Sequence, residues 1–146
     1  MIWEFTNDRA ISAQIVEIIQ KGILSGVYPP GSNMPSVRTL AVEAGVNPNT
    51  MQKALAELEV QGLLRTVRTT GRTVTEDERL IRMLKDQAAG NCIEYYFTQM
   101  HGLGIERDDA VAMIVSRAQT GASDVHQTST NTTLMAVAPS TNTEVN

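Results

Sequence analysis

The chain has 146 residues, 42% of them hydrophobic, and a formal net charge of −4, which suits one domain or a small domain with an appendage. Its apolar runs are far shorter than the roughly 20 residues that span a bilayer, and the start, MIWEFTNDRA, lacks the basic and apolar regions of a signal peptide. Cys92 is the single cysteine, which excludes an internal disulfide and a cysteine-rich zinc site. We therefore expect a soluble cytoplasmic protein without a membrane partner.

Residues 10–25 place isoleucine and leucine at helical spacing, and Gly26 follows as a stop signal. Pro29, Pro30 and Gly31 cannot continue a helix and predict a turn. Ser36 suits the N-cap of a short second helix, which ends at Gly45. The first half of the chain thus begins with two helices joined by a turn.

Residues 47–61 predict a third helix. Asn47 suits its N-cap, and Pro48 suits the first helical position, where a missing N–H costs nothing. Its apolar residues recur at helical spacing and form one buried stripe: Met51, Ala54, Leu55 and Leu58. Gly62 follows the helix as a stop signal.

Residues 63–75, LLRTVRTTGRTVT, have β-branched residues and no helical stripe, so they predict two short strands joined by a tight turn around Thr70-Gly71-Arg72. This places Arg72 at the hairpin tip. Three helices followed by a hairpin, with a short glycine-containing turn between the last two helices, are typical of a winged helix-turn-helix. The predicted fold is mostly α with a small β-hairpin, and residues 1–75 are its DNA-binding domain.

The helical pattern returns at Glu76, with Gly90 as a weak point, and breaks at residues 101–105 before another helix that starts near Asp108. Residues 76–118 are too few to bury their apolar side chains alone, so we expect them to pair with a second copy of the chain. Residues 119–146 are rich in Thr, Ser and Asn without a sustained period, and we expect a disordered polar tail.

Four apolar or aromatic residues are the candidates for the dimer interface: Ile93, Tyr96, Phe97 and Met100. A ligand pocket lined by Tyr95, Tyr96 and Phe97 is the alternative for the same segment, and it leaves a small-molecule effector open. The chain has two histidines, His101 and His126, and one cysteine, and no spacing among them supports catalysis or a metal site. We expect neither an enzyme nor a cofactor.

Basic charge gathers in the first half of the chain. Residues 1–75 contain seven Lys or Arg and six acidic residues, whereas residues 76–146 contain five basic and ten acidic residues. Arg65, Arg68 and Arg72 lie within eight residues of one another. This distribution allows a nucleic-acid partner in spite of the negative sum.

In a helix-turn-helix the second helix of the motif presents its start to base edges in the major groove. Asn49 and Gln52 share a face there, and each can bond adenine with two hydrogen bonds. Lys53 can reach a phosphate or a guanine. Thr50 suits a phosphate oxygen at the helix start. Exposed Asn, Gln and Lys can equally be no more than solvated residues, so their placement together is what favours DNA binding.

Two further arginines belong to the same hypothesis. Arg38, on the preceding helix, would point toward the same groove. Arg72, at the expected hairpin tip, would enter the minor groove, whose negative potential attracts arginine.

Residues 11–75 resemble the DNA-binding domain of the GntR family of bacterial regulators. The shared pattern includes a G-x-x-x-P-G turn, P-S-x-R-x-L-A, G-V-N-x-x-T and L-x-x-x-G-L, spread over some 50 residues. The short chain after the hairpin is most similar to the YtrA subfamily, in which a helical pair mainly dimerises. The resemblance implies DNA contacts at the following positions: Arg38, Asn47, Asn49, Thr50, Gln52, Lys53 and, in the wing, Arg72.

Two departures from the family pattern concern the cap and the wing. Thr39 stands where the family often has a glutamate, so Ser36 lacks a capping-box partner. The wing tip reads TTGRTV, with one glycine instead of two.

The sequence therefore predicts a homodimeric transcription regulator that binds double-stranded DNA, a repressor acting on an inverted repeat. The resemblance suggests a transporter operon or the protein's own operon as target. A winged helix that binds another protein without specific DNA readout is the alternative. The salt dependence of binding separates the two, because DNA affinity falls steeply with ionic strength.

Overall fold

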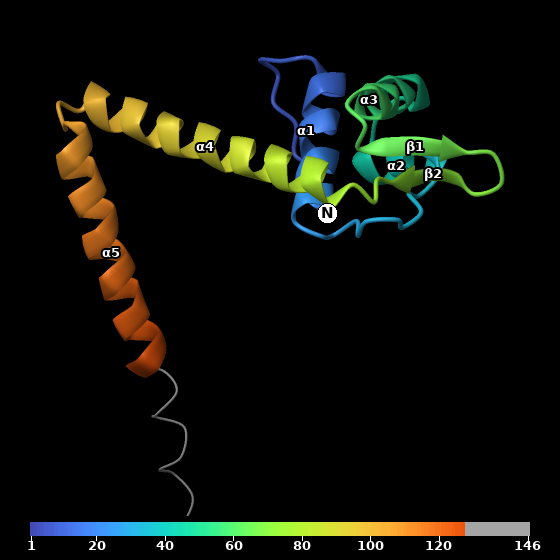
Figure 1. The fold of residues 1–146 in the computed structure, drawn as a ribbon. Helices are drawn as coiled ribbons and strands as arrows, with labels where there is room; N and C mark the ends of the chain where they lie inside the picture. The colour runs from blue at the N-terminus through green and yellow to red at the C-terminus, as the bar shows by residue number, and fades with distance from the viewer. Residues whose placement is uncertain (128–146) are drawn as a thin grey trace, which may run out of the picture. The chain divides into compact units, whose positions relative to one another are not determined.

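The computed structural model describes residues 1–127, which form five helices and a two-stranded sheet (Figure 1). The chain divides into two compact units, Met1–Asn91 and a second unit that begins at Cys92. The first unit thus extends past residue 75, where the sequence predicts the end of the first domain. The first turns of the fourth helix belong to the first unit, where Leu84 packs against its hydrophobic core.

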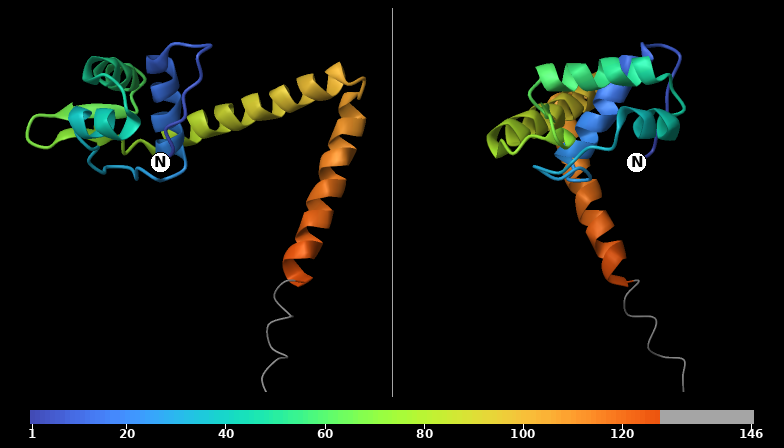
Figure 2. Two further views of the ribbon diagram at one scale, coloured as in Figure 1. Left: turned by 180° about the vertical axis from the view of Figure 1, so that it is seen from behind. Right: turned by 90° about the vertical axis from the view of Figure 1, so that its right-hand side faces the viewer.

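The first unit contains α1 (Ile11–Leu24), α2 (Val37–Ala44), α3 (Pro48–Val60), β1 (Leu64–Val67), β2 (Gly71–Val74) and the beginning of α4 (Glu78–Gly102). Its largest fully buried side chains come from the three helices, from β2 and from the residue just before β1: Ile15, Ile19, Ile23, Leu40, Met51, Leu55, Leu58, Leu63 and Val74. In Figure 1 and the left view of Figure 2, the three helices and the hairpin form one cluster from which the hairpin loop projects. Burial of each such side chain contributes about 1.5–3 kcal/mol, which fixes α3 against α1 and α2.

Both predicted helix starts are capped as expected. The Ser36 Oγ accepts a hydrogen bond from the Thr39 N–H at 3.1 Å, and its hydroxyl lies 2.9 Å from that of Thr39. The Asn47 Oδ1 accepts from the Asn49 N–H at 2.8 Å. Between the two helices Gly45 has φ +65°, a left-handed conformation that glycine adopts without a steric penalty and that ends α2. These local interactions set the angle at which α3 leaves the turn.

Replacing Asn47 by alanine should lower the free energy of unfolding by about 1 kcal/mol, because one amide of the α3 start loses its acceptor. Urea denaturation measures the change. Asn49→Ala is the matched control, since the Asn49 side chain is exposed and caps nothing; it should stay within about 0.5 kcal/mol of the wild type. Equal losses in the two variants would contradict the capping role.

The hairpin has a different turn from the predicted one. Its strands pair antiparallel with Leu64 opposite Val74 and Val67 opposite Gly71, so the loop consists of residues 68–70. The Thr70 N–H bonds the Val67 carbonyl at 3.3 Å, and Gly71 follows with φ +82°. A β-turn followed by a left-handed glycine is a standard closure of a hairpin. Gly71 therefore begins β2 instead of occupying the middle of the turn.

The second unit contains the end of α4 and α5 (Arg107–Gln127). Met100 and Ala110 are buried where the two helices meet, and the Tyr96 hydroxyl donates to the Ala110 carbonyl at 2.8 Å. The predicted break lies between the helices, and Gly90 does not interrupt α4. The predicted polar tail begins too early, because α5 continues to Gln127; residues 128–146 lie outside the described residues. In the described part of the chain, no helix has the length and apolar character needed to cross a membrane.

Candidate nucleic-acid interface

The buried stripe of α3 determines which of its residues face outward. Met51, Leu55 and Leu58 are fully buried against α1 and α2. The opposite face of the same helix exposes the predicted base-reading residues Gln52 and Asn49, and Thr50 at the edge of the stripe is half-buried. The prediction of α3 and of its orientation is confirmed.

Four of the predicted contact residues lie at or near the start of α3: Asn47, Asn49, Thr50 and Gln52. Lys53 follows one turn into the helix and is exposed. Its side chain lines a small depression between α1 and α3 that also contains Glu57. No residue of the described chain bonds the side chains of Gln52 and Lys53, so both are available to an external partner.

Arg38 occupies the second position of α2, and its side chain is exposed. The start of α2 lies beside the hairpin, because the Met34 N–H bonds the Arg72 carbonyl at 2.8 Å. Residues of the two segments, among them Ser36 and Thr70, line one open depression of about 300 Å³. Arg38 is therefore an exposed residue on a helix whose start lies beside the hairpin.

Arg72 is not at the hairpin tip. It lies in β2 with 16% of its side chain exposed, and its Nε is 3.2 Å from the Glu59 Oε1 of α3. The same Glu59 oxygen accepts a hydrogen bond from the Thr66 hydroxyl of β1. The expected position of Arg72 was wrong because the tight turn was centred on Gly71, whereas the strand register places this glycine after the turn.

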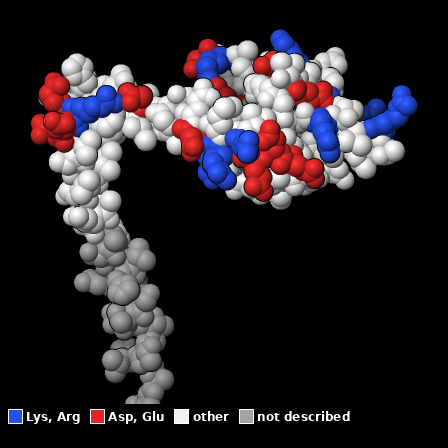
Figure 3. Space-filling model, viewed as in Figure 1, with Lys and Arg blue, Asp and Glu red and all other residues white. Residues whose placement is uncertain are grey.

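Arg68 occupies the position that was expected for Arg72. It is the first residue of the loop and is exposed. Figure 3 shows Lys or Arg atoms protruding at the end of the first unit that carries the hairpin loop. The sequence identified Arg68 only as one of three clustered arginines. Counting residue pairs along the hairpin from Leu64–Val74 to Val67–Gly71 is what places Arg68 in the loop.

The predicted dimer residues differ in how exposed they are within the single chain. Ile93 is 52% exposed, whereas Met100 is buried inside the chain at the α4–α5 contact. Tyr96 and Met100 line an open, mostly apolar depression of about 560 Å³ together with Met113 and Ile114 of α5. The α5 residues were not among the predicted interface residues, although their spacing matches the same helix face.

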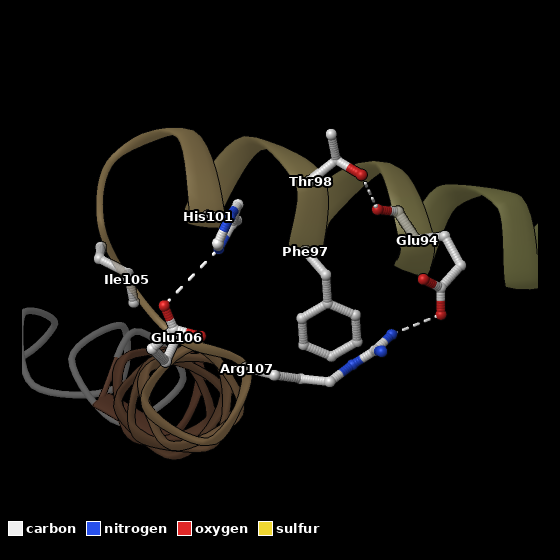
Figure 4. A pocket seen from close by; sticks show the side chains of 7 residues that line it. All are labelled: Glu94, Phe97, Thr98, His101, Ile105, Glu106 and Arg107. Atoms are coloured by element: carbon white, nitrogen blue, oxygen red, sulfur yellow. Dashed lines mark hydrogen bonds and ion pairs between the residues drawn. The ribbon is translucent and has the colours of Figure 1, made fainter.

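The Phe97 ring lies beside that of Tyr96, with the ring centres 5.5 Å apart, and points toward Arg107 of α5 in Figure 4. The Arg107 guanidinium of α5 lies 4.1 Å from the centre of its ring and bonds Glu94 at 2.5 Å. Phe97 thus lines a pocket of about 300 Å³ with charged residues, while Tyr95 is 67% exposed. The three aromatic residues do not line one ligand pocket. Within residues 1–127 no group of His, Cys, Asp or Glu is placed to hold a metal ion.

Comparison with known proteins places this arrangement in a family. Residues 11–74 match the family model described as "Bacterial regulatory proteins, gntR family". The chain is 30% identical over 118 residues to the uncharacterized HTH-type transcriptional regulator YhcF of Bacillus subtilis, covering 81% of this chain and 98% of that protein. It is 34% identical over 93 residues to the HTH-type transcriptional repressor YtrA of the same organism, covering 60% and 72%.

The solved structures that resemble this chain include members of the same family. A GntR family transcriptional regulator from Listeria monocytogenes superposes with a TM-score of 0.71 at 38% identity, over 77% of this chain and 98% of that one. Its match extends through the winged helix into the helices that follow. The chain belongs to the GntR family of bacterial transcription regulators.

Proposed function

We propose that the protein represses transcription as a homodimer bound to a short inverted repeat in double-stranded DNA. The family makes it a DNA-binding transcription regulator rather than an enzyme. The observation that supports specific readout is the start of α3, where uncharged polar side chains face outward on a helix held in place by its buried stripe. The repressor role follows the printed description of YtrA as a repressor. The cytoplasm is the compartment in which this role is carried out.

Each side chain has a distinct task in this proposal. Asn49 and Gln52 read base edges in the major groove, where each can form paired hydrogen bonds to adenine. The remaining contacts hold the phosphate backbone and position the helix without reading sequence: Arg38, Asn47, Thr50 and Lys53. Arg68, not Arg72, enters the minor groove from the hairpin loop.

The homodimer is proposed from the apolar residues that the second unit leaves exposed. On α5, Val111, Ile114 and Val115 are each more than 40% exposed. Such a surface is stabilised when a second copy covers it. A two-fold dimer then presents two α3 helices to half-sites about one helical turn apart.

Selection of bound sites from random duplex DNA, with the purified protein, tests the proposal. We expect two half-sites in inverted orientation, and an affinity that falls steeply as salt rises. An enriched sequence without symmetry would contradict the dimer on an inverted repeat. Affinity that does not change with salt would contradict the DNA-binding mode as a whole.

Arg68→Ala should weaken binding to the selected duplex and lower the slope of log affinity against log salt by about one, because one cation leaves the DNA. A salt titration of the binding constant measures the slope. Arg79→Ala is the control, since Arg79 is an exposed arginine in the first turn of α4; it should leave the slope unchanged. If the two variants behave alike, the loop does not contact DNA.

A further inference from the structure

We infer that Glu59 is a positioning residue that fixes the hairpin to the recognition helix and so aims the loop at DNA. The inference rests on the proposed function, in which the hairpin loop contacts DNA. Glu59 lies near the end of α3, and its Oε1 accepts from the Thr66 hydroxyl of β1 and from the Arg72 Nε of β2 at 3.2 Å. One carboxylate oxygen therefore joins α3 to both strands.

The register makes this contact a clamp across the hairpin. Thr66 and Arg72 are directly opposite each other in the antiparallel pair, so their side chains lie on one face of the sheet. The next pair toward the tip, Val67 and Gly71, closes the loop that carries Arg68. Glu59 thus holds the hairpin one residue pair from the loop.

Other contacts hold a different edge of the hairpin. Residues 31–34 bond the backbone of β2, including the Val74 N–H to the Ser32 carbonyl at 2.9 Å and the Met34 N–H to the Arg72 carbonyl at 2.8 Å. These bonds fix β2 to the turn before α2. Near the loop, the Glu59 side chain joins the hairpin to α3.

The Arg72–Glu59 ion pair is partly shielded from water, so it holds the two side chains in place more firmly than a surface pair does. The side chains of Arg72 and Glu59 are 16% and 27% exposed, so water screens their attraction less than it screens a surface ion pair. The carboxylate also occupies Arg72, which is therefore a structural cation of the hairpin. The two ends of α3 thus have different roles in the proposed complex. The start of the helix contacts base edges, and Glu59 near its end orients the hairpin.

A double-mutant cycle between Glu59 and Arg68 tests the inference with the full chain and the selected duplex. In the wild type, Arg68→Ala should reduce affinity about tenfold. In a Glu59→Ala background the same change should cost less than about twofold, because an unaligned loop makes little contact to lose. Glu57→Ala is the matched control: Glu57 is an exposed glutamate on the same helix, and within residues 1–127 its side chain accepts a hydrogen bond from Gln61 alone, at 3.3 Å.

Hydrogen exchange of the free protein gives a readout that does not depend on DNA. Glu59→Ala should speed exchange at the amides of β1 and β2 while the amides of α1 keep their wild-type rates, and Glu57→Ala should change neither. Should Glu59→Ala not fold, Glu59→Gln replaces it; its amide oxygen still accepts but carries no charge, so the same effects are expected at smaller size.

The inference would be overturned if Arg68→Ala still reduced DNA affinity about tenfold in the Glu59→Ala background. Unchanged hydrogen exchange at the hairpin amides of Glu59→Ala would overturn it too. If Arg68→Ala is silent in the wild type, the proposed loop contact fails, and hydrogen exchange alone then decides whether Glu59 fixes the hairpin. The two failures are therefore distinguishable.

Discussion

Ile114→Glu should turn the dimer into a monomer and weaken binding to the selected inverted repeat by about 100-fold or more, because two linked half-site contacts become one. Ile114 is 46% exposed on α5 and lines the apolar depression between α4 and α5. A carboxylate buried there by a second copy loses its hydration without gaining a partner, which costs several kcal/mol. Sedimentation equilibrium measures the state of assembly, and a binding titration measures the affinity.

Ala112→Glu is the control for this change. It adds the same charge to the same helix, at an exposed position two residues earlier and so on the other side of α5. This variant should remain dimeric and bind as the wild type does. If Ile114→Glu stays dimeric at the same concentration, the copies meet through another surface.

Gln52→Ala should reduce affinity for the selected site by about 1–3 kcal/mol and relax the preference at one base position in each half-site. Gln52 is exposed in the second turn of α3, and the neighbouring Met51 is fully buried and fixes the roll of the helix. In the proposed complex the side chain is then free to meet a base edge without rearrangement of the core. Titrations against duplexes that carry each of the four base pairs at every half-site position measure the change.

Lys53→Ala provides the contrast, because the two residues are adjacent on the helix and differ in the expected contact. A phosphate contact should weaken binding to all duplexes by a similar factor and lower the salt slope by about one. A uniform loss for Gln52→Ala would make it a backbone contact too, and the reading of bases would then rest on Asn49.

The helical part of the first unit was predictable because its signals are local. Asn47 and Pro48 mark the start of α3, and Met51, Ala54, Leu55 and Leu58 mark its buried face, all within one stretch of chain. A cap and a stripe together fix both the limits and the roll of a helix. The orientation of Gln52 followed from them.

The hairpin was less predictable because its register depends on distant partners. Gly71 has a left-handed φ, which suits a turn centre and a turn end equally well. The pairing that distinguishes them involves Asn33, which forms a bridge to Thr73, and Glu59, which holds Arg72. Neither contact is visible in the spacing of residues 63–75, so Arg72 was assigned to the tip in place of Arg68.

The prediction that a polar tail begins at residue 119 was wrong for a related reason. Residues 119–127 are polar and small, which resembles a tail in composition, yet they continue α5. Helical hydrogen bonds within the backbone need no apolar stripe to extend a helix that has already formed. The contact between α4 and α5 is likewise not visible in the spacing of residues 76–118, so the burial of Met100 within the single chain was not predicted.

The cap of α3 has a consequence for how this helix meets a phosphate. Helix starts usually attract anions through several open amides. Here Pro48 has no N–H, the Asn49 N–H is occupied by the Asn47 side chain, and the Met51 N–H bonds the Asn47 carbonyl. The Thr50 N–H is the one amide that α3 can offer in its first turn. The backbone at the start of α3 therefore offers little anion affinity of its own, so in the proposed complex the phosphate contacts fall mainly to side chains such as Lys53.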